Sequence, residues 1–261
     1  MNDDMFGSFR IDCPSNLLQN GDLPYTLRIG HFDRNGVGVP LLIPFAGVSG
    51  ICFETDPGSR PHALRQMEYM ALGLLGSVAS EAVNLIFVDI SLNTNFPIMC
   101  SFDSPNVKFV TNRDSLRNEL SRIQENARYI STKCLGYNYA DLREYNGSTE
   151  FKEPYNILFV SNFPKDFTDS EIDTVALLME EGEKCGVRVI MNIERQYFPE
   201  DNAYNKSRYS RLYKLCENAL RLDCTVEPFR IHNLQADIIS DLLLTGSFRF
   251  DSYDVQSVSR V

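Results

Sequence analysis

Apolar segments of strand length, separated by segments of helix length, constrain this chain most strongly. The segment Leu85–Ile90 is apolar almost throughout rather than at alternate positions, which is typical of a strand covered on both faces in a parallel sheet. Strands that alternate with helices form βαβ units and hence a mostly parallel sheet between helical layers. The sequence therefore predicts an α/β fold. The strong strand segments are Gly50–Thr55, Leu85–Ile90, Asn156–Asn162 and Val187–Ile193.

Helical periodicity predicts the connections between these strands. A helix is expected to begin at Pro61, because proline suits a first helical position where its missing N–H is not needed. Apolar residues at helical spacing follow it: Ala63, Met67, Met70, Ala71, Leu74 and Leu75. Further helices are expected at Asp114–Cys134, Tyr139–Tyr145, Asp169–Cys185, Lys206–Arg221 and Gln235–Leu244, and shorter strands at Val107–Val110 and Thr225–Ile231.

A β-hairpin is expected over residues 26–45, in front of this alternation. Asn35-Gly36 separates two apolar runs, and this pair favours a type I′ turn because both residues tolerate positive φ. Residues 1–24, rich in Asn, Asp, Gly and Pro, predict a loosely ordered lead-in or linker. We expect residues 25–261 to form a single domain whose tail, from residue 247, is an extra strand or a docking segment.

Charge and cysteine usage exclude several classes of function. The net charge of −10 argues against a broad nucleic-acid surface on the isolated chain, although a local basic loop or a basic neighbouring subunit remains compatible with it. No apolar run is long enough to span a membrane, and the N-terminus lacks the features of a secretory signal. Seven cysteines without a CxxC pair indicate a reducing cytoplasm, and three distant histidines show no metal-ligand spacing.

A series of local motifs follows in fixed order along residues 27–195. They are the hairpin at 27–45, Asp89 at a strand end, Ser104-Pro105-Asn106-Val107, Glu125 with Arg128-Tyr129 and Tyr145-Asn146, and Glu183–Ile190. Together they resemble the motor domain of the FtsK/SpoIIIE (HerA-like) family of hexameric DNA-pumping ATPases. The resemblance implies a RecA-like P-loop NTPase fold, a three-layer sandwich with its phosphate-binding loop after the Gly50–Thr55 strand.

The phosphate-binding loop departs from the family pattern. The family's G-x-x-G-S-G-K-[ST] loop corresponds to Thr55–His62, of which Gly58 and Ser59 match. Pro61 stands in place of the lysine that reaches the β- and γ-phosphates, and it removes one backbone N–H from the loop. His62 stands in place of the hydroxyl that holds Mg²⁺, and Asp56 adds a negative charge beside a site for a polyanion.

The other catalytic positions are also replaced. Ser161-Asn162 stands where the family's second catalytic strand ends in Asp-Glu, so neither residue can act as a base or hold a hard cation strongly. Asn192-Ile193 replaces the family's Thr-Gln sensor. The phosphate-binding loop, the acidic strand end and the sensor are all replaced, which predicts an inactive domain with no catalytic residues. Its vestigial nucleotide-binding set is Gly58, Ser59, Arg60, Pro61, His62, Asp89, Ser161, Asn162 and Asn192.

Several of these side chains have alternative interpretations. Arg60 is expected to be a solvated turn residue rather than a phosphate contact. His62 is expected at the surface or in a capping role rather than as an anion contact. Asp89 is either a relic catalytic carboxylate or a strand-end residue that caps the next loop.

Basic side chains allow functional and structural interpretations too. An arginine completing a neighbour's site would come from Arg113, Arg122 or Arg128, but a helix face salt-bridged through Glu119 and Glu125 is the expected arrangement. The basic segment Lys206–Arg221 would face DNA in a ring, or form the solvated or subunit-facing surface that we expect.

The leading hypothesis is a catalytically inactive FtsK-like domain, without cofactor or metal. It would serve in the cytoplasm as an assembly or interaction module, in a homo- or hetero-oligomer with an active motor that reaches DNA through the assembly. Resemblance to the family implies DNA movement, secretion of protein substrates or defence. The alternative is an active ATP-driven DNA translocase with atypical nucleotide-binding motifs, which requires ATP and Mg²⁺. A third hypothesis is a pocket that holds a different ligand or a peptide.

Overall fold

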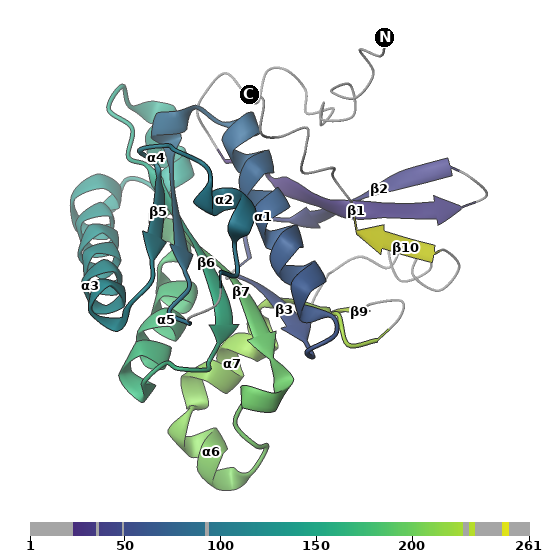
Figure 1. Ribbon diagram of the computed structural model, residues 1–261. Coiled ribbons are helices and arrows are strands. Elements are labelled where there is room, and N and C mark those ends of the chain that lie inside the picture. The colour runs from purple at the N-terminus through teal and green to yellow at the C-terminus, as the bar shows by residue number, and fades with distance from the viewer. Residues whose placement is uncertain are drawn as a thin grey trace.

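The main feature of the computed structural model is a seven-stranded sheet in the order β5-β4-β6-β7-β3-β8-β9 (Figure 1). The structure describes residues 23–34, 37–48, 50–91, 94–226, 230–232 and 247–250. Every pairing in the sheet is parallel except that of β8 with β9. The strands are β3 (Ile51–Thr55), β4 (Val83–Val88), β5 (Val107–Val110), β6 (Tyr155–Phe163), β7 (Val187–Glu194), β8 (Leu220–Asp223) and β9 (Arg230–His232).

Helical layers cover both faces of this sheet. Every residue of β3, β6 and β7 is buried, which confirms the parallel sheet predicted from continuous apolarity. Along β6, Phe159 packs with the helix α1 (Arg60–Ser77) and Leu158 packs with the opposite helices, because successive side chains point to opposite faces. That opposite layer consists of α3 (Arg113–Tyr129), α5 (Asp169–Glu181) and α7 (Ser210–Asn218).

A separate antiparallel sheet of three strands stands beside α1 (Figure 1). Its strands are β1 (Thr26–Arg34), β2 (Val37–Pro44) and β10 (Ser247–Phe250). Arg34 pairs with Val37, so the hairpin has the two-residue connection predicted at Asn35-Gly36, which itself lies outside the described residues. The base of the hairpin joins the α1 side of the core through Leu27, Ile29, Leu41 and Ile43. The pairing of β10 with β1 confirms the extra strand predicted in the tail.

Several helices begin at the residues that the sequence marks as helix starts. Pro61 lies in the first turn of α1, one residue after its start, as expected. Asn112 caps α3 by accepting a hydrogen bond from the Ser115 N–H at 2.9 Å, and Thr168 begins α5 in a capping box with Glu171. The predicted helix Asp114–Cys134 is α3 followed by a π-helical segment, η4 (Ile130–Leu135).

Short elements complete the chain. They are η3 (Ser80–Ala82), α2 (Pro97–Cys100), α4 (Leu142–Ser148), η5 (Glu183–Cys185), η6 (Arg195–Tyr197) and α6 (Ala203–Arg208). Gly186, which ends the α5–η5 segment as predicted, has a φ of +80°, and a Cβ there would lie 2.3 Å from a methyl carbon of Leu142. Only glycine fits this turn into β7. Across the described part of the chain, no helix is long and apolar enough to cross a membrane.

Three predicted elements differ from the structure. The helix expected at Tyr139–Tyr145 begins at Leu142, because Asp141 caps it by accepting the Glu144 N–H at 2.9 Å. The helix expected at Lys206–Arg221 is divided into α6 and α7 at Tyr209, and Arg221 lies in β8.

The strand expected at Thr225–Ile231 agrees with β9 at Arg230 and Ile231, and residues 227–229 lie outside the described residues. Thr225 instead lies in a turn, since the Asp223 carboxylate accepts both its N–H and its hydroxyl, at 3.0 and 2.7 Å. Residues 1–22 of the expected lead-in and the helix Gln235–Leu244 lie outside the described residues.

Candidate functional site

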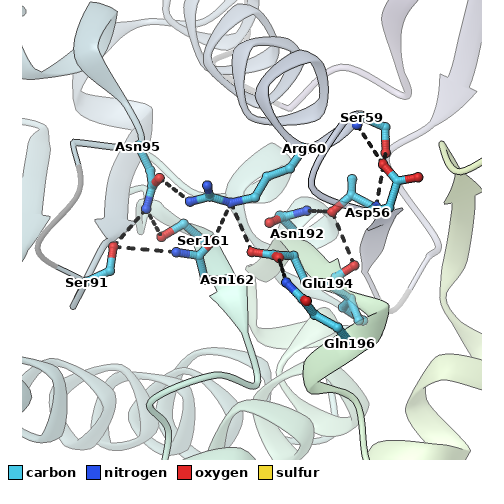
Figure 2. Close-up of polar contacts among 12 residues, drawn as sticks. Asp56, Ser59, Arg60, Ser91, Asn95, Ser161, Asn162, Asn192, Glu194 and Gln196 are labelled. Atoms are coloured by element: carbon cyan, nitrogen blue, oxygen red, sulfur yellow. Dashed lines mark hydrogen bonds and ion pairs between the residues drawn. The ribbon is translucent and has the colours of Figure 1, made fainter.

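The predicted nucleotide-binding residues gather at the carboxyl edge of the parallel sheet, where ligands bind in open α/β folds (Figure 2). Residues 56–59 lead from β3 into α1, and the ends of β4, β6 and β7 lie beside this loop. The edge brings together Asp56, Ser59, Arg60, Ser161, Asn162 and Asn192. Asp89 joins them through its contact with the Ser161 hydroxyl. Pro61 and His62 are exposed in the first turn of α1, so the surface position expected for His62 is confirmed.

Asp56 occupies the backbone donors of its own loop. Its Oδ1 accepts hydrogen bonds from the N–H of Gly58 at 3.0 Å and from the N–H and hydroxyl of Ser59, each at 2.8 Å. Backbone N–H groups of this kind, between a strand and a helix N-terminus, are what a P-loop presents to phosphate. The hydrogen bonds from Ser59 and Gly58 lower the pKa of Asp56, so a carboxylate stands in the anion position.

Arg60 fills the adjacent space with its guanidinium group. Its Nε donates to Oδ1 of Asn162 at 2.6 Å and forms an ion pair with Oε1 of Glu194 at 3.1 Å, while Nη2 donates to Oδ1 of Asn95 (Figure 2). The expectation of a solvated turn residue is wrong, because Arg60 opens α1 and its side chain is only 21% exposed. The oxygen atoms of Asn95, Asn162 and Glu194 contact its guanidinium group and hold the side chain inside the site.

Asp89 caps the loop that follows β4. Its Oδ2 accepts the Asn95 N–H at 2.8 Å, and its Oδ1 accepts from the Asn95 amide at 2.7 Å, the Ser91 hydroxyl at 2.8 Å and the Ser161 hydroxyl at 3.1 Å. Of the two interpretations of Asp89, the loop-capping one is confirmed. The carboxylate is 7% exposed, and its hydrogen bonds shape the segment that presents Asn95 to Arg60.

The end of β6 carries amide and hydroxyl groups where a catalytic strand would carry carboxylates. Ser161 donates to Asp89, and Asn162 turns its Oδ1 toward Arg60. Asn162 has a φ of +54°, and the pairing of β6 with β7 shifts register between Val160 and Phe163. Asparagine tolerates this left-handed conformation better than most residues, and the irregular strand end directs its amide into the site.

Asn192 ties β7 to the strand before the loop. Its Nδ2 donates to the Thr55 hydroxyl at 2.7 Å, and its side chain is fully buried. Its Oδ1 has no hydrogen-bond partner among the described residues. The amide therefore holds β3 and β7 together at the level of the loop.

Four residues of the site were missed by the sequence analysis: Ser91, Asn95, Glu194 and Gln196. Glu194 follows directly on the predicted strand Val187–Ile193, so its position at a strand end was a usable signal. Gln196 donates to its Oε2 at 2.7 Å. Asn95 lies in an irregular loop, where no periodicity indicates which way a side chain points.

The buried carboxylate of Glu68 holds the segment that directly follows Asn95. Glu68 of α1 is 1% exposed, and its Oε1 accepts the N–H groups of Ile98 and Met99 at 2.7 and 3.0 Å. These are orphan donors in the first turn of α2, just after Asn95. Burial raises the pKa of Glu68 to about 7, although the two hydrogen bonds act in the opposite direction.

A second network binds β3, β7 and β8 beside the site. Glu54 forms ion pairs with Arg221 at 2.6 Å and Arg195 at 3.1 Å, and Arg195 also pairs with Asp223 at 2.8 Å. Glu54 is 8% exposed, so these two arginines are the partners of a largely buried carboxylate.

The basic side chains are mostly occupied within the chain. Arg122 pairs with Glu119 at 2.7 Å, which confirms the salt-bridged helix face for that residue. Arg113 donates to the backbone oxygen of Asp166, and Arg128 is exposed near the end of α3. In the segment expected to be one basic helix, four cations pair with acids of this chain: Lys206 with Asp201, Arg208 with Asp169, Lys214 with Glu180, and Arg221 with Glu54.

A cavity of about 470 Å³ lies away from the carboxyl edge, between the C-terminal halves of α3 and α5. Ala127, Leu177 and Leu178 contribute its apolar lining. Its charged lining comprises the cations Arg128 and Lys184 and the acids Glu180, Glu181 and Glu183. Across the described residues, no cluster of three His, Cys, Asp or Glu side chains is arranged to hold a metal ion.

Comparison with known proteins identifies the fold. No family model matches the chain, and no curated protein matches it significantly. EssC (ATPases 2 and 3) from Geobacillus thermodenitrificans superposes with a TM-score of 0.60 at 14% identity, covering 77% of this chain and 37% of that one. The cytoplasmic domain of EssC gives 0.61 at 14% identity, over 91% and 48%. The pCW3 conjugation coupling protein TcpA, in its monomer form with ATPgS, gives 0.51 at 13% identity, over 87% and 63%.

The chain thus spans less than two thirds of each of these structures. At such low identity the likeness shows the fold, which is the RecA-like P-loop fold of FtsK/SpoIIIE-type ATPase domains. The family resemblance noted in the sequence is confirmed at that level.

Proposed function

From the fold of an FtsK-like P-loop ATPase domain, we propose that this chain is a catalytically inactive module that acts through assembly. It would stand beside an active DNA-translocating or secretion ATPase, as a neighbouring domain or subunit. The observation that carries the proposal is the Asp56 carboxylate on the N–H groups of Gly58 and Ser59. A site built to hold an anion is occupied by the chain's own anion.

The residues present do not fit a nucleotide with Mg²⁺. A triphosphate would have to displace the Asp56 carboxylate from Gly58 and Ser59 and would meet its negative charge at short range. Pro61 stands at the lysine position and is exposed on the helix surface. Arg60, whose side chain lies within this edge, already contacts Asn95, Asn162 and Glu194.

The positions for the attacking water and its base do not fit catalysis either. Ser161 and Asn162 do not ionise, so they cannot accept a proton from water. Asp89 accepts four hydrogen bonds from Ser91, Asn95 and Ser161, and these bind it to the loop. What the chain retains is a packed scaffold, which is the part of such a domain that can contribute an interface.

The similar structures support a role inside a larger assembly. The EssC structure contains ATPases 2 and 3 in one protein, and this chain corresponds to 37% of it. A domain whose phosphate-binding loop no longer binds nucleotide can still pack in such an array, because packing between domains depends on their surfaces rather than on hydrolysis.

A nucleotide titration tests the proposal. Labelled ATP with Mg²⁺ is expected to show no saturable binding to the wild-type chain, and micromolar binding would overturn the proposal. The rival hypothesis, an active translocase, predicts ATP hydrolysis that DNA stimulates and Asp89→Ala abolishes. Light scattering, with the chain alone and mixed with an FtsK-like ATPase that has an intact loop, then tests assembly. A purely monomeric result in both samples would contradict the assembly role.

A further inference from the structure

We infer that Asn95, Asn162 and Glu194 form a guanidinium-binding site that Arg60 fills from within the same chain. The inference rests on the proposal that this edge no longer holds a nucleotide, and it names what the edge holds instead. The chemical class that the site accepts is a planar guanidinium cation.

Three acceptors from distant parts of the chain converge on Arg60 (Figure 2). Asn95 precedes α2, Asn162 lies near the end of β6, and Glu194 is the last residue of β7. Their exposed fractions are 7%, 5% and 5%, so the oxygens are shielded from water. A guanidinium group has five N–H donors in a rigid plane, which matches several oxygens arranged around it.

Contacts other than those with Arg60 orient the acceptors. The Asn95 amide nitrogen donates to Asp89 and to Ser91, so its oxygen must face the opposite way, toward Arg60. Gln196 holds the second oxygen of Glu194. The left-handed backbone at Asn162 directs its amide, and such positions concentrate at functional sites because surrounding contacts must maintain them.

Charge makes this a site for a cation rather than for water. Without Arg60, the Glu194 carboxylate would be buried beside two amide oxygens and would lose its ion pair. An ammonium ion restores the charge but donates from one point, whereas guanidinium donates along several directions in a plane. The site therefore selects guanidinium over ammonium.

The consequence is a fixed carboxyl edge. Arg60 connects the start of α1 to the loop before α2, to β6 and to β7. In an active P-loop domain a bound nucleotide and its metal make connections of this kind. Here Arg60 makes such connections from within the chain, which suits a domain that serves as a constant surface.

The test is chemical rescue of Arg60→Ala. We expect its Tm to fall by about 5–10 °C, since two or more charge-assisted contacts are lost. Millimolar methylguanidinium is expected to recover most of that loss, whereas methylammonium is not. The matched control is Arg65→Ala, which removes an exposed arginine from the same helix and should show no rescue. Equal responses of the two variants, or of the two cations, would overturn the inference.

A second measurement covers the case in which Arg60→Ala does not fold. In the wild-type protein, the Nε–H of Arg60 is expected to give a slowly exchanging NMR signal, unlike that of Arg65. Exchange of both at the same rate would contradict the inference. Nucleotide binding to the wild type would overturn the proposed function, but a failed rescue with no nucleotide binding would remove only the guanidinium site.

Discussion

Arg60 donates through Nε to Oδ1 of Asn162 at 2.6 Å, although the two residues are 102 positions apart in the chain. One belongs to the first turn of α1, and the other lies near the end of β6. Their direct contact means that side chains of the protein itself connect the start of α1 to the end of β6.

Asp56→Ala is expected to create weak affinity for pyrophosphate. The substitution frees the N–H groups of Gly58 and Ser59, which then face a site without a competing carboxylate. A thermal-shift titration with pyrophosphate should stabilise this variant and leave the wild type unchanged. Asp103→Ala, which removes an exposed acid from another loop, is the control and should behave as the wild type. A wild type that responds as strongly as Asp56→Ala would contradict the account of the occupied loop.

Glu68→Gln is expected to become more stabilising as the pH rises. The pKa of Glu68 is raised from 4.5 to about 7 in the folded protein. The stability linked to its proton is therefore fully present below about pH 4.5 and is lost as the pH rises through 7. Glutamine keeps an oxygen for the N–H groups of Ile98 and Met99 without ionising, so its advantage at pH 8 is at most about 3 kcal/mol. Unfolding measured at pH 5 and pH 8 checks this, and a constant difference would refute it.

Glu54→Gln is expected to destabilise the fold by about 2 kcal/mol, because Arg195 and Arg221 lose a largely buried partner. For a chain of this size the Tm should fall by about 6 °C. Asp201→Asn serves as the control, since its pair with Lys206 is exposed on both sides and should leave the Tm unchanged. An equal effect of the two substitutions would show that burial of Glu54 does not matter.

Weak binding to duplex DNA is expected at physiological salt. The cations of α6 and α7 are largely paired with acids of the same chain, and the net charge is −10. Asp169→Asn and Asp201→Asn together release Arg208 and Lys206, and fluorescence anisotropy should detect higher affinity and a steeper salt dependence for this variant. Tight, salt-dependent binding by the wild type would contradict this expectation.

Local patterns predicted the parallel sheet and most of its helices. Buried strands such as Asn156–Asn162 have an uninterrupted apolar centre, here Ile157–Val160. Asn112 and Pro61 mark helix starts through backbone chemistry that a few neighbouring residues determine. Predictions failed where a side chain interacted across a turn. Asp141 delayed the start of α4, and Asp223 ended β8 before Thr225.

The sequence by itself predicted which of the family's groups are missing: the lysine at Pro61, the hydroxyl at His62, and the acids at Ser161 and Asn162. Those are identities at positions in a motif, and they need no coordinates. Only the tertiary structure decided what takes their place, namely the Asp56 carboxylate on the loop and the Arg60 guanidinium between Asn162 and Glu194. The direction of a long charged side chain depends on acceptors brought near it by the folding of distant segments, so no local pattern encodes it.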